Sequence, residues 1–233
     1  MKTTARTFNE TVFAKIGFLV CWIPVLYFDS AYSKIEGGVW ITCLLTAILF
    51  VFQYKKATLR LRLLMILIVP LSYIGELIST EVLGLYAYRL GAVPLYIPIG
   101  HAVVYASACQ IFLAEPIRKW VQIRRNKILG AYALLFLLVL LFFEDTLSAI
   151  MGAFLFWMLI KKRNHSIYLI IGLVVLYLEI IGTSLGNWAW DQNPFVFHTT
   201  NPPLGSVMIY VGGDALLNKT LRIALRIRGR LVP

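Results

Sequence analysis

Glu76-Leu-Ile-Ser-Thr80-Glu-Val-Leu-Gly84-Leu-Tyr86-Ala-Tyr88 has a counterpart later in the chain, Glu179-Ile-Ile-Gly-Thr183-Ser-Leu-Gly186-Asn-Trp188-Ala-Trp190. Each copy places an acidic residue inside an apolar run and ends in two aromatic residues separated by Ala. The match continues, because Pro98-Ile-Gly100 and Tyr105 correspond to Pro203-Leu-Gly205 and Tyr210. A charge within an apolar run is costly in a membrane and marks a functional position. The sequence therefore predicts two repeated halves, about 1–120 and 121–233, and makes the two Glu residues the first candidates for function.

The composition is that of a membrane protein. Hydrophobic residues make up 60% of the chain and charged residues only 14%, whereas typical soluble domains carry about 25% charged residues. Several apolar runs approach the length of about 20 residues that crosses a bilayer. We therefore expect a single all-α, polytopic membrane domain over residues 1–233, surrounded by the lipid bilayer.

The apolar runs predict about eight transmembrane helices. They lie near residues 12–29, 36–54, 60–80, 94–114, 127–144, 146–160, 167–186 and 203–218. The sixth run is short and follows a tight turn at Glu144-Asp145-Thr146. The fifth and sixth runs therefore either cross separately or form a helical hairpin that does not cross fully.

The basic residues predict the orientation. With the N-terminus inside, all of the 22 Lys and Arg residues except Lys34 and Arg89 fall on the cytoplasmic side, as the positive-inside rule requires. Both termini are therefore predicted to be cytoplasmic, and the protein is predicted to lie in the plasma (inner) membrane. Short basic clusters between apolar runs also account for the net charge of +11 through contact with anionic lipid, so nucleic acid is not expected as a partner.

The predicted halves have the same orientation. Four crossings return the chain to its starting side, so the halves would be parallel and related by a pseudo-twofold axis along the membrane normal. In each half the motif passes from the third span into the fourth. Glu76 and Glu179 would then face each other at one depth, near the external side.

Helical spacing places Thr80 and Thr183 one turn after the two acids, on the same face of the helix. We expect their hydroxyl groups to hydrogen-bond the carboxyl groups and hold their rotamers. Gly84 and Gly186 follow and permit a turn.

The aromatic residues after each turn have two interpretations. They belong either to the aromatic belt at the membrane interface or to the lining of a substrate site, since alternation puts both members of a pair on one side of an extended segment. The external loop 187–203 is likewise either a lid over a pocket or an ordinary solvated loop. The predicted substrate-binding residues are Thr80, Tyr86, Tyr88, Tyr105, Thr183, Trp188, Trp190, Asn201 and Tyr210.

The copies differ at two polar positions. His101 stands where the second copy has Ser206, and Asp214 stands where the first has Cys109. An isolated Asp or His in a membrane helix usually faces the bundle interior. We expect His101 near the level of the two Glu residues and Asp214 toward the cytoplasmic half. For Asp214 the structural alternative is a hydrogen bond to Asn218 or a snorkelling position near Lys219.

Two carboxyls in a cavity of low dielectric suggest acid chemistry. Desolvation and mutual repulsion favour the neutral form of at least one of them. Such an acid suits protonation of an alkene or an epoxide, and aromatic faces can stabilise the resulting cation. A transporter would use the same groups to relay protons. The candidate catalytic residues are Glu76, Glu179, Asp214 and His101.

Other catalytic signatures are missing from the sequence. Three histidines are too few for the His-rich di-iron sites of membrane desaturases. The chain contains no Gly-Xaa-Ser-Xaa-Gly, His-Glu-Xaa-Xaa-His or Walker sequence. We therefore expect neither a metal nor another cofactor.

The region Glu76–Tyr105 resembles membrane proteins of carotenoid biosynthesis that hydrate the ends of acyclic carotenoids. The resemblance rests on Glu76, Thr80, Gly84, Tyr86, Tyr88 and Val93-Pro94-Leu95. Gly186-Asn-Trp188-Ala-Trp190 is similar to a later element of that family, but the Pro-Phe-Gly that precedes its Tyr-Xaa-Tyr turn is missing here. More broadly, the chain is similar to small integral-membrane terpene cyclases. Both likenesses imply an acid-initiated reaction on a polyprenyl chain, either hydration or cyclisation.

Three functions remain open from the sequence. The first is an enzyme that acts on an isoprenoid or another lipid-soluble small molecule. The second is a small proton-coupled transporter or permease, and the third is a non-catalytic membrane protein in which the Glu–Thr pairs only tie helices together. The sequence indicates neither the substrate nor an oligomeric state.

Overall fold

The computed structural model describes residues 17–161 and 165–231. Over these residues the regular structure is helical except for two strands of three residues each, which confirms the all-α prediction. The helices are α2 (Trp22–Tyr27), α3 (Gly38–Lys56), α4 (Leu59–Leu77), the π-helical turn η1 (Ile78–Val82), α5 (Tyr96–Leu113), α6 (Glu115–Phe143), α7 (Thr146–Lys161), α8 (His165–Ser184) and α9 (Ser206–Leu231). The strands are β1 (Tyr86–Tyr88) and β2 (Trp188–Trp190).

Among the described residues, five helical segments are long and apolar enough to cross a membrane. They are Gly38–Lys56, Leu59–Val82, Tyr96–Leu113, Glu115–Phe143 and Ser166–Ser184. Gly17–Tyr27 and Thr146–Lys161 are apolar but shorter. α9 is not one of the five, and Asp214, Lys219 and Arg222 interrupt its apolar run. Residues 12–16 of the first predicted span lie outside the described residues.

Many large apolar side chains point outward from the bundle. Phe142, near the end of α6, is 74% exposed, and Leu141 and Phe143 beside it are also exposed. Contiguous exposed apolar surface of this kind is unusual on a soluble monomer. The outer surface of α6 therefore suits hydrocarbon rather than water.

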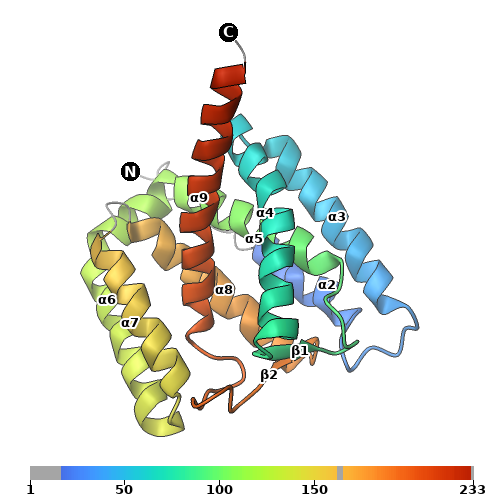
Figure 1. Ribbon diagram of the computed structural model, residues 1–233, viewed down its shortest axis with the longest axis vertical. Helices are drawn as coiled ribbons and strands as arrows, with labels where there is room; N and C mark the ends of the chain where they lie inside the picture. Colours follow the sequence, from blue (N-terminus) through green and yellow to red (C-terminus); the bar gives the residue numbers. More distant parts are fainter. Residues whose placement is uncertain (1–16, 162–164, 232–233) are drawn as a thin grey trace, which may run out of the picture.

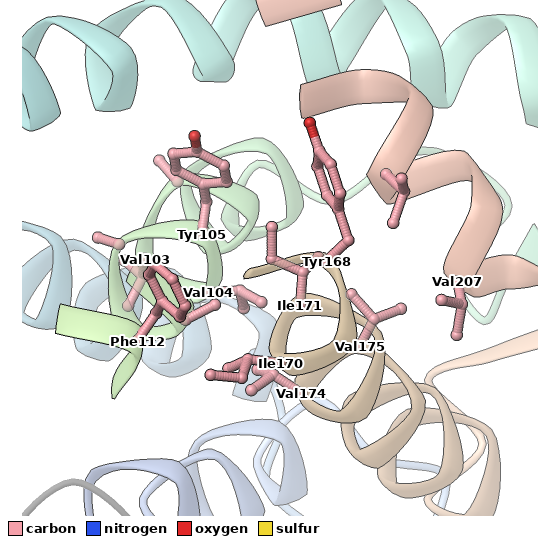
Figure 2. Packing of buried hydrophobic residues seen from close by; sticks show 14 of the residues in the cluster. Val103, Val104, Tyr105, Phe112, Tyr168, Ile170, Ile171, Val174, Val175 and Val207 are labelled. Atoms are coloured by element: carbon pink, nitrogen blue, oxygen red, sulfur yellow. The ribbon is translucent and has the colours of Figure 1, made fainter. Parts of the chain in front are cut away.

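Helix α5 lies at the centre of the bundle and packs against α3, α4 and α8. Ala102, Val103 and Ala106 of α5 are completely buried, and small side chains allow neighbouring helices to approach closely. Figure 2 shows valines of α5 facing the isoleucines and valines of α8. α9 runs beside α4 and ends beyond the other helices, at the end of the molecule opposite the strands (Figure 1).

The two copies of the motif meet as paired strands. Gly84 and Gly186 adopt positive φ angles of 59° and 68°, so each helix turns sharply into the strand that follows it. β1 and β2 then pair antiparallel at the closed end of the bundle, with Tyr86 opposite Trp190, Ala87 opposite Ala189 and Tyr88 opposite Trp188 (Figure 1). Each strand thus presents the same aromatic–Ala–aromatic pattern to its partner, as in a contact with twofold symmetry.

The copies differ in length by one residue, and η1 absorbs the difference. Three residues separate Thr80 from Gly84, whereas two separate Thr183 from Gly186. The N–H of Leu83 bonds the carbonyl of Ile78, five residues back, which is the pattern of a π-helix. The wider turn accommodates the extra residue, so the strand after it still matches its counterpart.

The threonines hold the backbone rather than the acids, which corrects the sequence-based expectation. Thr80 Oγ1 donates to the carbonyl oxygen of Glu76 at 2.9 Å, and Thr183 Oγ1 donates to that of Glu179 at 2.7 Å. In a helix the carbonyl four residues back is the nearest acceptor for a threonine hydroxyl. The carboxyl groups are therefore free to take other partners.

A buried ion pair fixes the position of β1. The carboxylate of Asp29, which follows α2, is buried and pairs with the guanidinium of Arg89, directly after β1. Arg89 Nε also donates to the Asp29 carbonyl at 2.8 Å, and the Tyr96 hydroxyl at the start of α5 donates to Oδ2 at 2.9 Å. One carboxylate therefore ties α2, β1 and α5 together.

Arg89→Met alone should destabilise the protein more than Arg89→Met combined with Asp29→Asn does. Removing one partner of a buried ion pair costs about 3–5 kcal/mol, and we expect the lower end because the Arg89 side chain is 34% exposed. Asp29→Asn combined with Arg89→Met removes the unpaired charge and should recover part of the loss. Thermal unfolding of the purified protein in detergent measures both. Equal melting temperatures for the single and double variants would show that the ion pair is not what holds β1.

Candidate functional site

A cavity of about 250 Å³ lies between α4, α5, α8 and α9, with the paired strands at one end. Two of these helices come from each predicted half of the chain. Ten of the thirteen candidate residues line the cavity. They are Glu76, Tyr86, Tyr88, His101, Tyr105, Glu179, Trp188, Trp190, Tyr210 and Asp214.

Glu76 is surrounded by hydrogen-bond donors. Its Oε2 accepts from the hydroxyl of Tyr86 at 2.6 Å and from that of Tyr88. Its Oε1 lies 2.9 Å from Nε2 of His101. Burial and the neighbouring Glu76 carboxyl raise the pKa of both tyrosines well above its ordinary value, so both remain protonated donors. This carboxyl therefore has partners on both oxygens.

Glu179 has a different set of donors. Its Oε2 accepts from the indole Nε1 of Trp188 at 3.0 Å and of Trp190 at 3.1 Å. Its other oxygen, Oε1, receives no hydrogen bond from the described part of the chain. The side chain lines the cavity and only 5% of the residue is exposed. Glu179 therefore has one oxygen available for a proton or for a bound molecule.

The strand pairing joins these two donor sets into one aromatic cluster. The rings of Tyr86 and Trp190 are 4.5 Å apart, and those of Tyr88 and Trp188 are 6.3 Å apart. Every ring donates to the carboxyl of its own copy while it contacts a ring of the other copy. The cluster holds aromatic faces beside both acids, an arrangement that favours a cation in the space between them.

His101 lies at the depth of the two acids, as its position one residue after Gly100 predicted. Its ring stacks on Tyr210 with centroids 5.0 Å apart and planes 5° apart. Because Nε2 lies against Glu76, a proton can pass between the carboxyl and the imidazole without a change of fold.

Asp214 forms a second polar group in the same cavity. Its carboxylate accepts from the hydroxyls of Tyr105 at 2.6 Å and Tyr168 at 3.0 Å, and from the Asn218 amide at 2.8 Å. Figure 2 shows the rings of Tyr105 and Tyr168 rising from α5 and α8 with their hydroxyl groups pointing the same way. Asp214 lies about 13 Å along the helix axis from Gly205, at about 1.5 Å per residue. The predicted partner Asn218 is present, but two tyrosines join it.

Three candidates do not line the cavity. Thr80 and Thr183 bond backbone carbonyls, as described above. Asn201 Oδ1 accepts from the backbone N–H of Trp190 at 3.1 Å, so it holds the backbone of β2 rather than a ligand in the cavity. Next to Asn201, Thr200 bonds the buried Asp145 carboxylate directly before α7, which anchors this part of the loop 187–203.

The sequence did not single out Tyr168 or the Asp29–Arg89 pair. Tyr168 stands eleven residues before Glu179, a separation of about three helical turns that puts both on one face of α8. That spacing was the available signal. Asp29 lies at the end of an apolar run, where an ordinary loop residue is the simplest interpretation.

Within residues 17–161 and 165–231, no three His, Cys, Asp or Glu side chains gather as ligands of a metal ion would. The polar groups of the cavity instead form the two clusters described above, one around the Glu residues and one around Asp214.

Comparison with known proteins gives no match: the chain fits no protein-family model, no curated protein sequence and no solved structure.

Proposed function

We propose that the protein is an integral-membrane enzyme that protonates an isoprenoid or another lipid-soluble substrate and so starts a hydration or a cyclisation. The observation that carries this proposal is the pair of buried carboxyls with unequal partners in one aromatic cavity. Glu76 has donors on both oxygens, whereas Glu179 has one oxygen without a partner among the described residues. Two like groups in different surroundings can take different roles in acid–base catalysis.

Glu179 is the proton donor in this proposal. Its Oε1 carries the proton, while the two indole N–H groups hold Oε2 and fix the rotamer. Glu76 is the carboxylate, because hydroxyl and imidazole donors satisfy an anion. His101, which lines the cavity with both acids, passes the proton that Glu76 receives back to Glu179 and so restores the starting state.

The chemistry balances with these groups alone. The O–H bond of Glu179 breaks, and the π electrons of a substrate alkene form the new C–H bond, leaving a cation on the neighbouring carbon. The aromatic cluster lies beside that cation and stabilises it through the ring faces. In hydration, water adds to the cation and gives a proton to Glu76. In cyclisation, a second alkene attacks the cation and a later proton loss to a carboxylate completes the isomerisation.

Asp214 acts on a more distant part of the substrate. The cavity-lining residues of α9 extend from Ile209 to Leu217, about 12 Å along the helix axis. A ligand that reaches from Glu179 to Asp214 is therefore elongated. Apolar side chains of α5 and α8, including Val104, Ala108 and Val175, line the length between the acids. The resemblance of Glu76–Tyr105 to carotenoid hydratases makes acyclic polyprenyl hydrocarbons the first substrates to test.

We place this enzyme in the plasma (inner) membrane with eight spans in two parallel halves and both termini in the cytoplasm. The basic residues support the orientation. The local twofold pairing of β1 with β2 supports the relation between the halves. Under this topology the two Glu residues lie near the external face, and α9 carries its basic end into the cytoplasm.

Glu76→Gln and Glu179→Gln should each abolish turnover, because each removes one of two carboxyls that the mechanism uses. The assay supplies an acyclic polyprenyl hydrocarbon to protein in liposomes made up in D₂O. Mass spectrometry then detects deuterium bound to carbon, with an added oxygen after hydration and without one after cyclisation. Glu115→Gln on α6 is the matched control, because this carboxyl is exposed and lies outside the cavity, and it should turn over like the wild type.

Full deuterium incorporation by both Gln variants would contradict the assignment of the acids. If instead the wild type incorporates none but moves a solute across the liposome membrane when a proton gradient is applied, the transporter is the correct function. Thermal unfolding confirms that the variants are folded, since a carboxyl that only tied helices together would lower the melting temperature when replaced.

Gly182→Ala should slow the reaction by displacing Trp188. A methyl group at Gly182 would overlap the Trp188 ring, so the indole that donates to Glu179 must shift. Glu179 becomes charged as it gives up its proton, and loss of a hydrogen bond to a charged group costs about 1.5–3 kcal/mol, which corresponds to a rate about tenfold lower or more. Trp188→Phe keeps most of the ring and removes the donor, so it should show a similar loss.

The matched control for this experiment is Gly130→Ala on α6, where an added methyl group meets open space. The deuterium assay measures all three variants. An unchanged rate in both Gly182→Ala and Trp188→Phe would mean that the indole does not position Glu179.

A further inference from the structure

The cavity opens to the side of the bundle rather than along its axis. Four of its lining residues are exposed, and all four belong to α4 or α9: Gly75 on α4, and Ile209, Gly213 and Leu216 on α9. Ile209 is 39% exposed and Leu216 is 56% exposed. The lining residues of α5 and α8, by contrast, are buried or only partly exposed. The opening therefore lies between α4 and α9, which run side by side in Figure 1.

Two glycines leave this opening wide. A Cβ atom added at Gly75 or at Gly213 would meet no heavy atom within 4 Å. Both glycines lie inside helices, where Gly is less favourable than Ala by about 1 kcal/mol. Packing does not demand a glycine at either position. What the two glycines share is that each leaves the edge of the cavity without a side chain.

The two ends of the opening are closed by polar contacts. Toward the basic end of α9, Arg60 Nη2 on α4 donates to Asn218 Oδ1 on α9 at 3.1 Å, and Asn218 also bonds Asp214. Toward the other end, the strands and the two Glu residues close the cavity. The gap is therefore a side window at the depth of the apolar middle part of the cavity.

The surface around the window is apolar. Ile74 and Ile78 near Gly75 are exposed, as are Ile209 and Leu216 on the facing helix. In a helix bundle that spans a bilayer, such a surface contacts hydrocarbon. A molecule that passes between these residues exchanges one apolar environment for another and keeps its chain out of water.

We propose that the window between α4 and α9, flanked by Gly75 and Gly213, is the route by which an apolar, chain-like lipid enters the cavity directly from the bilayer. The ligand class rests on the proposed function, but the route does not depend on which reaction follows. A chain inserted through the window lies with one end at the Glu pair and its length along α5 and α8. A polar or charged solute has no favourable path through the same gap.

Photolabelling in liposomes tests the route without relying on catalysis. The probe is a geranylgeraniol analogue with a diazirine at the end of its chain. Mass spectrometry maps its adducts onto Val104, Ala108 and Val175, which line the cavity and are buried from the outer surface. Wild-type protein should be labelled at these residues, and an excess of unlabelled geranylgeraniol should suppress the labelling.

The decisive variants are Gly75→Phe and Gly213→Phe, which put a ring into the window. Each should lose the labelling inside the cavity, down to the level seen with excess competitor, while labelling on the outer surface of the bundle persists. Gly130→Phe on α6 is the matched control, because this glycine is also helical and exposed and has open space for a side chain. It should label like the wild type. If a Phe variant shows no cooperative thermal unfolding and is therefore not properly folded, Gly75→Leu and Gly213→Leu repeat the test with a smaller side chain.

Two results would overturn the route. Undiminished cavity labelling in both Phe variants would mean that the lipid enters elsewhere. The proposed reaction would then still be tested separately by the deuterium assay. Absence of cavity labelling in the wild type would show that no apolar chain binds there. Loss of turnover in Glu76→Gln and Glu179→Gln with cavity labelling retained would leave both the route and the reaction standing. Turnover that survives in both Gln variants would contradict the proposed reaction but not the proposed entry route.

Discussion

The pairing of β1 with β2 is the interaction on which the rest of the site depends. These two short strands have the same sequence pattern, so each offers the other the same alternation of outward Ala and inward aromatic residues. The aromatic residues on the inner side donate hydrogen bonds back to the carboxyl on the preceding helix. Each strand therefore fixes its own acid, and the pairing brings the two acids to one cavity. The buried Asp29 carboxylate holds Arg89 at the end of β1 and stabilises this arrangement from outside.

The two copies of the sequence motif differ in the groups that surround their carboxyls. Tyrosine hydroxyls and a histidine surround Glu76, whereas among the described residues Glu179 accepts hydrogen bonds from indole N–H groups alone. An indole donates and never accepts, so it holds one oxygen of the acid without competing for the proton on the other. The two copies of the motif thus bring two acids with unlike neighbours into one cavity, as the proposed division into a proton donor and a carboxylate requires.

The sequence was sufficient to predict most of the polar residues that line the cavity, because a charge within an apolar run is costly and needs a reason. Glu76, Glu179, His101 and Asp214 follow from that rule, and the spacing of the aromatic residues predicted that both members of each pair face one side. The sequence was insufficient where partners come from distant segments or where two local acceptors compete. No sequence pattern within either segment indicates that β1 pairs with β2. The threonine hydroxyls bond backbone carbonyls instead of the Glu carboxyls, because in a helix the carbonyl is the closer acceptor. Length alone did not give the number of spans. Within the described residues five helical segments are long and apolar enough to cross a membrane, and α9 is not one of them, because Asp214, Lys219 and Arg222 interrupt its apolar run.

The most direct test of the central claim is a cross-link between Ala87 and Ala189. These residues lie opposite each other and are exposed on the side away from the cavity. Their backbones form a hydrogen-bonded antiparallel pair, for which the Cα atoms are about 5.5 Å apart, within the range that a disulfide bridges. Ala87→Cys combined with Ala189→Cys, in a protein whose three native cysteines are replaced by Ala, should form an intramolecular disulfide on mild oxidation of the membranes, found by mass spectrometry as one joined peptide. Each single Cys variant should give none. Failure of the double variant to cross-link while it remains folded would contradict the pairing, and with it the account of how two acids from distant parts of the chain share one site.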